Sequence, residues 1–200
     1  TIAGRWQISQ QHSYATAAAK EISVTPSGLH HVPGSGEHGT GGGTVIHFLL
    51  EAVMRSPEAD CHALARMALA EQGLDPAVAP AAVRVVEQVT SSDVWVRALN
   101  SKQWLVEVPF VTRIAPEQST TGLPTMLRGV IDLAFEEQDG WVIVDYKTDR
   151  ARTPAEKASL VRHYGDQIRA YGKHWQAITR QTVVESGIWA TETNTWLPIS

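Results

Sequence analysis

Hydrophobic and polar residues alternate along two neighbouring stretches in the second half of the chain, Arg128–Phe135 and Trp141–Lys147. Successive residues of a strand point to opposite faces, so this two-residue period predicts two β-strands. Between them lies Asp139-Gly140, a strong signal for a hairpin turn. We therefore expect an antiparallel hairpin.

The register of this hairpin depends on which residues form its turn. With Asp139-Gly140 at the centre, Asp132 lies opposite Lys147; with Gln138-Asp139 at the centre, Asp132 lies opposite Asp145. Either two-residue loop puts the two acids and the lysine on one face, whereas a three-residue loop moves Asp132 to the other face. The sequence leaves these alternatives open.

Two acids and a lysine within apolar strands carry a desolvation cost that a partner must offset. A divalent metal ion is one such partner, because hard cations take carboxylate oxygens; Lys147 would then hold a phosphate or the attacking water. The competing interpretation is an ordinary hairpin on a solvated face. In that case Asp132 and Asp145 pair with Lys147 or Arg128.

Apolar periodicity predicts further elements on both sides of the hairpin. Helices are expected at Thr44–Arg55, Cys61–Leu69, Ala77–Val89, Val94–Leu99 and from Thr153 to Thr179, the last in one piece or in two broken near Gly165. Its apolar stripe consists of Leu160, Tyr164, Ile168, Tyr171, Trp175 and Ile178. Strands are expected at Gln103–Ile114, Val183–Ala190 and Thr195–Ile199.

Two polar residues stand out in these elements. His47 lies on the same line of its helix as Thr44, Glu51 and Arg55, so that line is either the solvent side or points His47 at a metal. Glu107 is the single acid of an otherwise apolar strand.

Residues 1–43 show no long apolar pattern and are expected to lie outside the folded domain. Residues 1–25 are expected to form a tail with a short helix, and the glycine-rich stretch His30–Gly43 a flexible loop. We therefore divide the chain into a flexible lead-in over residues 1–43 and a folded domain over residues 44–200. His30, His31 and His38 are weak metal candidates in so flexible a stretch.

Composition narrows the class of protein. The 200 residues, 43% of them apolar, suit one compact domain with its own core. The single cysteine, Cys61, excludes an internal disulfide, a four-cysteine zinc site and a four-cysteine iron–sulfur cluster. No run is apolar enough to span a membrane and no secretory signal opens the chain, so we expect a soluble intracellular protein. The chain begins at Thr1 without a methionine, as a piece of a longer protein would.

Five segments, in order, resemble the RecB-like nuclease domains of the PD-(D/E)xK superfamily, which lie at the C-terminus of bacterial helicase–nucleases of the AddA and RecB kind. They are Gly43–His47 (GTVIH), Glu107–Phe110 (EVPF), Gly129–Asp132 (GVID), Asp145–Asp149 (DYKTD), and Gln167 with Tyr171. GxxxH or Gln-x-x-x-Tyr alone is a weak signal. The combination is specific: GxID is followed by DYKTD, with the histidine upstream and the Gln/Tyr pair downstream. The resemblance covers roughly residues 44–190.

The resemblance implies an α/β fold with a mixed central sheet flanked by helices, and a DNA nuclease dependent on Mg²⁺ or Mn²⁺. His47, Asp132 and Asp145 would bind the metal, with the Tyr146 carbonyl as a fourth ligand. Lys147 would orient or activate the attacking water, and Glu107 would sit near the metal. Gln167 and Tyr171 would support the scissile phosphate or the DNA strand.

Two departures qualify the resemblance. The four cysteines of the iron–sulfur members are absent, which implies the type without a cluster. No helicase motor is present, so we expect a motor in the same chain or complex, acting in double-strand-break processing in the bacterial cytoplasm near the nucleoid. The competing hypotheses are a non-catalytic module binding DNA ends or a partner, which should have lost a ligand or the lysine, and an unrelated protein with a structural acidic hairpin.

The formal charge of −4 shows no basic excess. Lysine and arginine contacts to phosphate supply most non-specific DNA affinity, so we expect the domain alone to bind duplex DNA poorly. Single-stranded or frayed ends, delivered by the motor, are the expected substrate.

Overall fold

The computed structural model describes residues 15–18, 40–118 and 122–200. Six strands in this part of the chain form one sheet: β1 (Ala15–Ala18), β2 (Gln103–Ile114), β3 (Thr125–Glu136), β4 (Trp141–Lys147), β5 (Val183–Ala190) and β6 (Thr195–Pro198). The order is β1-β3-β4-β5-β6, and β2 pairs with β3. The β1–β3 and β4–β5 pairs are parallel and the others antiparallel, so the sheet is mixed.

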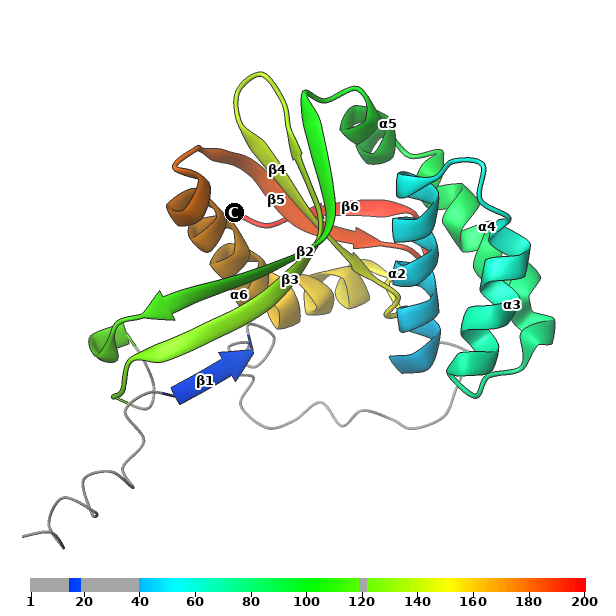
Figure 1. Ribbon diagram of the computed structural model, residues 1–200, viewed down its shortest axis with the longest axis horizontal. Helices are drawn as coiled ribbons and strands as arrows, with labels where there is room; N and C mark the ends of the chain where they lie inside the picture. Colours follow the sequence, from blue (N-terminus) through cyan, green and yellow to red (C-terminus); the bar gives the residue numbers. More distant parts are fainter. Residues whose placement is uncertain (1–14, 19–39, 119–121) are drawn as a thin grey trace, which may run out of the picture.

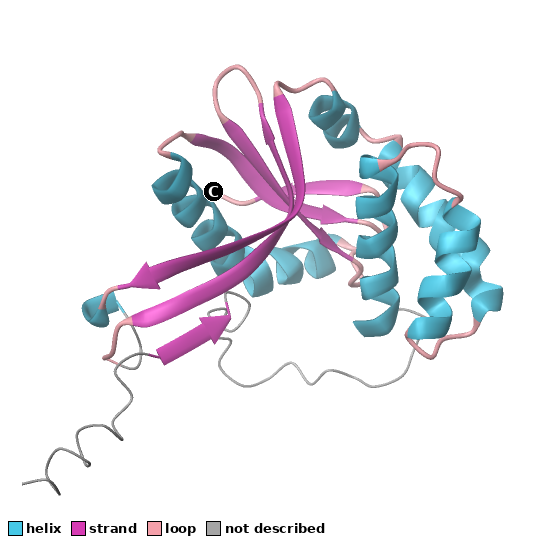
Figure 2. Cartoon of the chain, viewed as in Figure 1, coloured by secondary structure: helices cyan, strands magenta, loops and turns pink. Residues whose placement is uncertain are grey.

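Helices cover both faces of the sheet (Figures 1 and 2). One layer contains α2 (Thr40–Arg55), α3 (Cys61–Glu71), α4 (Ala79–Thr90) and α5 (Asp93–Leu99), with the short 3-10 helix η2 (Pro76–Val78) before α4. On the other face lies α6 (Pro154–Thr179); the 3-10 helix η3 (Pro116–Gln118) follows β2. The expected mixed sheet flanked by helices is therefore confirmed. Within the described part of the chain, no helix has the length and apolar content to cross a bilayer.

Two hydrophobic clusters, one on each face, hold the layers together. The first joins α2–α5 to the sheet and includes the fully buried Leu49, Leu133 and Phe135. The second joins α6 to the sheet and includes Ile143 and Ile168. Each core thus forms from the apolar stripes of its helices and the apolar residues of the strands beneath them.

Capping residues fix where the helices begin. The Asp60 carboxylate accepts from the Ala63 N–H, and the Ser92 hydroxyl accepts from the Trp95 N–H. Thr153 and Glu156 form a reciprocal capping box at the start of α6, with Pro154 in its first turn. The Thr153-Pro154 start expected from the sequence is confirmed.

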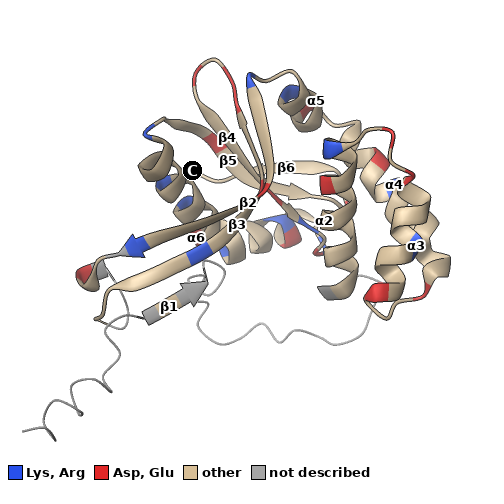
Figure 3. Cartoon of the chain, viewed as in Figure 1, with Lys and Arg blue, Asp and Glu red and all other residues tan. Residues whose placement is uncertain are grey.

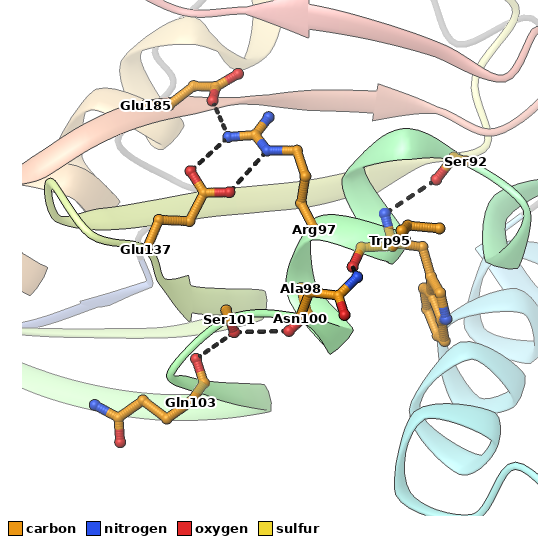
Figure 4. A network of polar contacts seen from close by, with 10 residues as sticks. Ser92, Trp95, Arg97, Ala98, Asn100, Ser101, Gln103, Glu137 and Glu185 are labelled. Atoms are coloured by element: carbon orange, nitrogen blue, oxygen red, sulfur yellow. Dashed lines mark hydrogen bonds and ion pairs between the residues drawn. The ribbon is translucent and has the colours of Figure 1, made fainter.

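Polar contacts near the turn between β3 and β4 join helix α5 to the sheet (Figure 4). The Arg97 guanidinium donates two hydrogen bonds to Glu137, of 2.9 and 3.0 Å, and one of 2.6 Å to Glu185. Glu137 follows β3 and Glu185 lies in β5, so one side chain joins three segments. We call these three residues the Arg97 clasp.

The expected flexible loop ends earlier than the sequence suggested. Helix α2 begins at Thr40 and not at Thr44, so three of the glycines expected to be flexible, Gly41–Gly43, are helical. A Cβ at Gly43 would lie 3.1 Å from the Thr148 hydroxyl oxygen, so glycine allows α2 to approach the segment after β4 closely. His30, His31 and His38 lie outside the described residues.

Two other expectations are corrected, and one open alternative, whether α6 is continuous, is decided. Ala15–Ala18 forms a strand, not a short helix, because pairing with β3 overrides the helix preference of alanine. Helix α6 runs through Gly165 without a break, because the buried residues on both sides outweigh a glycine cost of about 1 kcal/mol. Ile178 is 51% exposed and does not belong to the buried stripe.

The hairpin register is one of the two expected alternatives. Leu133 pairs with Val144 and Glu136 with Trp141. The Glu137 N–H donates to the Gly140 carbonyl at 2.9 Å, which leaves Gln138-Asp139 at the tip. One step beyond the last pair, Asp132 therefore lies opposite Asp145.

Strand β2 changes the face of its side chains at Glu107. Val106 and Phe110 are four residues apart and should share a face, yet Val106 packs under α2–α5 and Phe110 under α6. The Glu107 φ of 48° lies in the left-handed region, which accounts for the break in alternation.

Strand β3 changes face opposite this point, at Asp132. Ile131 packs under α6, whereas Leu133 packs under α2–α5. The β2–β3 register is the same on both sides of the change, so the two strands turn over together. Beyond it, residues 108–114 and 125–131 form what we call the arm, which extends away from α2–α5 with β1 alongside (Figure 1).

Candidate active site

The candidate site lies where the sheet opens between β3 and β4. On the edge of β3 away from β2, residues 125–128 pair with β1 and residues 133–136 with β4, so no described strand pairs with residues 129–132 there. A cavity of about 500 Å³ opens at this point. Its lining consists of His47, Pro109, Phe110, Val111, Arg128, Gly129, Val130, Asp132, Asp145, Lys147, Gln167 and Tyr171.

His47 meets two carboxylates at the turnover of β2 and β3. Its Nδ1 atom lies 3.4 Å from Asp132 Oδ1 and 3.8 Å from Glu107 Oε1. Helix α2 supplies His47 from one face of the sheet, while the other two side chains lie at the pair where both strands change face. His47 therefore points at this cluster, although Thr44 and Arg55 on the same line of α2 are exposed.

Tyr146 supports this cluster through its backbone. Its N–H donates to Asp132 Oδ2 at 2.7 Å, and His47 Nε2 lies 3.0 Å from its carbonyl oxygen. The first contact holds one carboxylate oxygen, leaving Oδ1 facing His47. The second fixes the orientation of the imidazole, as a backbone carbonyl commonly does for a histidine that binds a metal.

Asp145 and Lys147 form a second, deeper pair. Their side chains are 2% and 16% exposed, and Lys147 Nζ forms an ion pair with Asp145 Oδ2. The expected alternative of an Asp145–Lys147 pair is thus present, but in a buried setting and not on a solvated face. Lys147 Nζ also lies 4.6 Å from the ring centroid of Tyr164, whose hydroxyl donates to Asp149 at 3.2 Å.

Helix α6 contributes the opposite wall of the cavity. Gln167 Nε2 donates to the Tyr171 hydroxyl at 2.6 Å, and both side chains are buried. Phe110 packs edge-on against Tyr171, with 5.5 Å between ring centroids. This contact ties the α6 wall to the arm.

The buried acids and bases hold one another in charged forms. Burial alone would lower the pKa of His47, but Asp132 and Glu107 raise it to about 10. Burial alone would raise the pKa of Asp132, but His47, Lys147 and the Tyr146 N–H bring it below its usual value. Burial raises the pKa of Asp145 to about 6 against the attraction of Lys147. A metal ion would therefore have to displace a proton from His47.

The donor set fits a divalent ion. One ligand atom from each of His47, Glu107 and Asp132 lies within 4.8 Å of the others. Two ligands on opposite sides of one ion, with bonds of about 2.0–2.4 Å, are about 4–4.8 Å apart. Asp145 lies outside this group, whereas the sequence predicted Asp145 as a ligand and placed Glu107 only near the metal. The ligand assignments of His47, Asp132, Asp145 and Tyr146 stay predictions.

The sequence did not predict the contact of Tyr164 with Lys147 and placed Tyr164 in the apolar stripe. The available signal was spacing: Tyr164, Gln167 and Tyr171 are three and four residues apart, so they share one face of a helix. Only the structure shows that Tyr164, on this face, contacts Lys147.

Comparison with known proteins agrees with this fold. A family model described as the PD-(D/E)XK nuclease superfamily matches residues 31–195, well over half of the chain. The chain belongs to the PD-(D/E)XK nuclease superfamily, as the resemblance implied.

Its relatives include bacterial proteins whose names describe them as subunits of an ATP-dependent helicase/nuclease. The one from Acetivibrio thermocellus is 31% identical over 157 residues, which are 74% of this chain and 12% of that protein. The one from Heliobacterium modesticaldum is 32% identical over 96 residues, 44% of this chain and 7% of that protein. The chain thus matches only about a tenth of the length of these relatives. A solved structure titled "Crystal structure of SSO0001" aligns with a TM-score of 0.39 and 10% identity, over 98% of this chain and 72% of that one.

Proposed function

We propose that this chain is the nuclease domain of a helicase–nuclease and hydrolyses DNA phosphodiester bonds with Mg²⁺ or Mn²⁺ in double-strand-break processing. The observation that carries the proposal is the meeting of His47, Glu107 and Asp132 beside the buried Asp145–Lys147 pair; all of these except Glu107 line one cavity. Membership of a nuclease superfamily supports the reaction class. The names of the relatives support the helicase context.

In this proposal His47, Asp132 and Asp145 hold the ion, with the Tyr146 carbonyl as a further ligand and Glu107 binding it directly or through water. A bound ion of this kind polarises a phosphoryl oxygen and lowers the pKa of a bound water. Side chains of the protein orient the water and position the DNA strand.

Lys147 has two tasks in the proposed reaction. Its ammonium group is placed by Asp145 and the Tyr164 ring, so it presents a fixed positive charge to the cavity. This charge orients the attacking water and offsets the negative charge that develops on the phosphate. Gln167 and Tyr171 line the facing wall and position the strand.

The test is cleavage of end-labelled linear DNA by the purified chain, on single-stranded, frayed and blunt duplex substrates. We expect cleavage that requires Mg²⁺ or Mn²⁺ and stops when EDTA is added. A folded chain that cuts none of these substrates at saturating Mn²⁺ would contradict the proposal.

A further inference from the structure

One face of the arm is exposed, and it starts at the site carboxylates. We call it the outer arm face. It consists of three cross-strand pairs beyond Glu107 and Asp132, in order Pro109–Val130, Val111–Arg128 and Arg113–Met126. Residues directly opposite each other in a sheet share a face, so these six side chains form one surface.

No described helix covers this face. The cluster under α2–α5 reaches Val106 on β2 and Leu133 on β3 but includes none of the six residues. The opposite face of the arm is buried under α6 through Phe110, Leu127 and Ile131. The change of face at Glu107 and Asp132 therefore turns the arm so that one side joins the α6 core and the other is left open.

The outer arm face combines exposed apolar surface with positive charge. Val111 is 54% and Val130 43% exposed, although both are apolar. Arg113 and Arg128 are exposed and make no ion pair with any described residue. Residues 108–114 and 125–131 contain no acid, so the arm strands are basic in a chain of net charge −4 (Figure 3).

This face is continuous with the candidate site. Pro109, Val111, Arg128 and Val130 line the same cavity as His47, Asp132 and Lys147. At about 3.3 Å per strand residue, Arg128 lies roughly 13 Å from Asp132 along β3, and the Arg113–Met126 pair roughly 20 Å. A chain of phosphates leaving the site along the arm would therefore meet two guanidinium groups in succession.

We infer that the outer arm face is the track for a single DNA strand entering or leaving the active site. Arg128 and Arg113 bind successive phosphates, while Pro109, Val111 and Val130 contact sugars and bases. Unpaired bases can reach apolar side chains between the arginines, whereas a duplex presents mainly its sugar–phosphate backbone. Pro109, Val111 and Val130 offer the bases no hydrogen-bonding groups, so this track should show little sequence preference. The inference rests on the proposed nuclease function.

The test measures binding of a fluorescein-labelled oligothymidylate by anisotropy in EDTA, over a series of KCl concentrations. Each phosphate contact on a single strand contributes about 0.7 to the slope of log affinity against log salt. The Arg113→Ala/Arg128→Ala variant should therefore lose about 1.4 from the slope. The matched control is Arg66→Ala/Arg84→Ala, which removes two exposed arginines from α3 and α4. The control should keep the slope of the unaltered chain.

A second measurement locates the strand. Photo-crosslinking with 4-thiothymidine in the oligonucleotide should label peptides from the arm. In cleavage assays with Mn²⁺, the Arg113→Ala/Arg128→Ala variant should show a raised KM and an unchanged kcat. Melting temperature verifies that the variants fold.

The outcomes separate the two proposals. A chain that binds and cuts single strands equally well with and without the arm arginines, or that crosslinks elsewhere, overturns the arm track and leaves the nuclease function standing. A chain that neither binds nor cuts DNA overturns both.

Discussion

At the scale of single residues, Lys147 is held from two sides. Asp145 forms an ion pair with it, and Tyr164 presents a ring to its ammonium group. Burial would lower the pKa of Lys147, but Asp145 and Asp132 raise it above its usual value. The lysine thus stays charged while its side chain is largely out of water.

Replacing Lys147 by alanine should affect stability and catalysis separately. Without metal, Lys147→Ala leaves the Asp145 carboxylate buried without its cation, and we expect a loss of up to about 3 kcal/mol in the free energy of unfolding. Mn²⁺ should restore much of this, while cleavage falls by about 10² to 10³. Thermal melts with and without Mn²⁺, beside cleavage rates, measure both effects. The control is Lys102→Ala, whose side chain is 56% exposed and pairs with Glu136. Near-normal cleavage by Lys147→Ala at saturating Mn²⁺ would count against its role.

Tyr164 should act through its ring. Tyr164→Phe keeps the ring over Lys147 and should retain kcat within about 3-fold, whereas Tyr164→Leu should lower kcat about 10-fold, as loss of a partly buried cation–π contact implies. NMR of ¹³C-labelled lysine gives a readout that needs no activity: the ring should shift the Lys147 ε-protons upfield, and only the leucine variant should lose the shift. Ile178→Ala, an exposed position on the same helix, is the control. Equal kcat and equal shifts in both tyrosine variants would refute this.

At the scale of elements, much could be predicted because each pattern is local. The bounds of Trp141–Lys147 follow from alternation, those of Gln103–Ile114 from its run of apolar residues, and the start of α6 from its cap. The pairing of Ala15–Ala18 with β3 depends on residues more than a hundred positions away, and no local pattern records it.

The candidate site was predictable only in part, for a related reason. The motif residues themselves carry the signal for His47, Asp132 and Lys147. The turnover at Glu107 breaks alternation in both strands at once, so counting positions along one strand cannot reveal it. The turnover places Glu107, and not Asp145, in the group with His47 and Asp132.

Glu107 should be strained where it stands. Glu107→Gly and Glu107→Ala both remove the carboxylate, but only glycine adopts a φ of 48° without strain, so we expect the glycine variant to be more stable by about 1 kcal/mol. Urea unfolding measures the difference. At Glu87, inside α4, the order should reverse because glycine weakens a helix by about 1 kcal/mol relative to alanine. An alanine variant as stable as the glycine variant at position 107 would show that the backbone there is unstrained.

The Arg97 clasp should make the hairpin end sensitive to acid. Hydrogen bonds from Arg97 lower the pKa of Glu137 from its usual 4.5. The stabilisation is therefore complete above about pH 4.5 and is lost as pH falls through the lower folded value. Glu137→Gln should cost about 1 kcal/mol at pH 7, since both partners are a third exposed, and much less at pH 3.

Urea unfolding of both proteins at pH 7 and pH 3 measures this difference. The matched control is Glu58→Gln, an exposed residue between α2 and α3. If Glu137→Gln and the unaltered chain differ by the same free energy of unfolding at both pH values, the Arg97–Glu137 contact is not the source of the acid sensitivity.

At the scale of the whole molecule, charge is distributed unevenly. The chain carries −4 overall, while the outer arm face is basic. We expect the domain alone to bind blunt duplex DNA weakly and to cut it slowly, because little cationic surface is available for the duplex backbone. Joined to a helicase motor, the same domain should cut faster, since tethering raises the local concentration of unwound strand.

The comparison is salt-dependent affinity and cleavage of blunt duplex, for the domain alone and for the domain within the larger protein. A motor variant unable to hydrolyse ATP serves as the control. Equal affinity and equal rates for both forms would show that the domain needs no motor.

The contact between His47 and the Tyr146 carbonyl joins residues 99 positions apart, and Tyr171 lies further along the chain still. During synthesis at about 5–20 residues per second, His47 is made roughly 6–25 s before Tyr171. Through that interval the nascent chain lacks Tyr171, which lines the cavity, so the cavity is incomplete. A hydrolase whose parts meet only after α6 has been made is expected to stay inert at least until the ribosome has passed that helix.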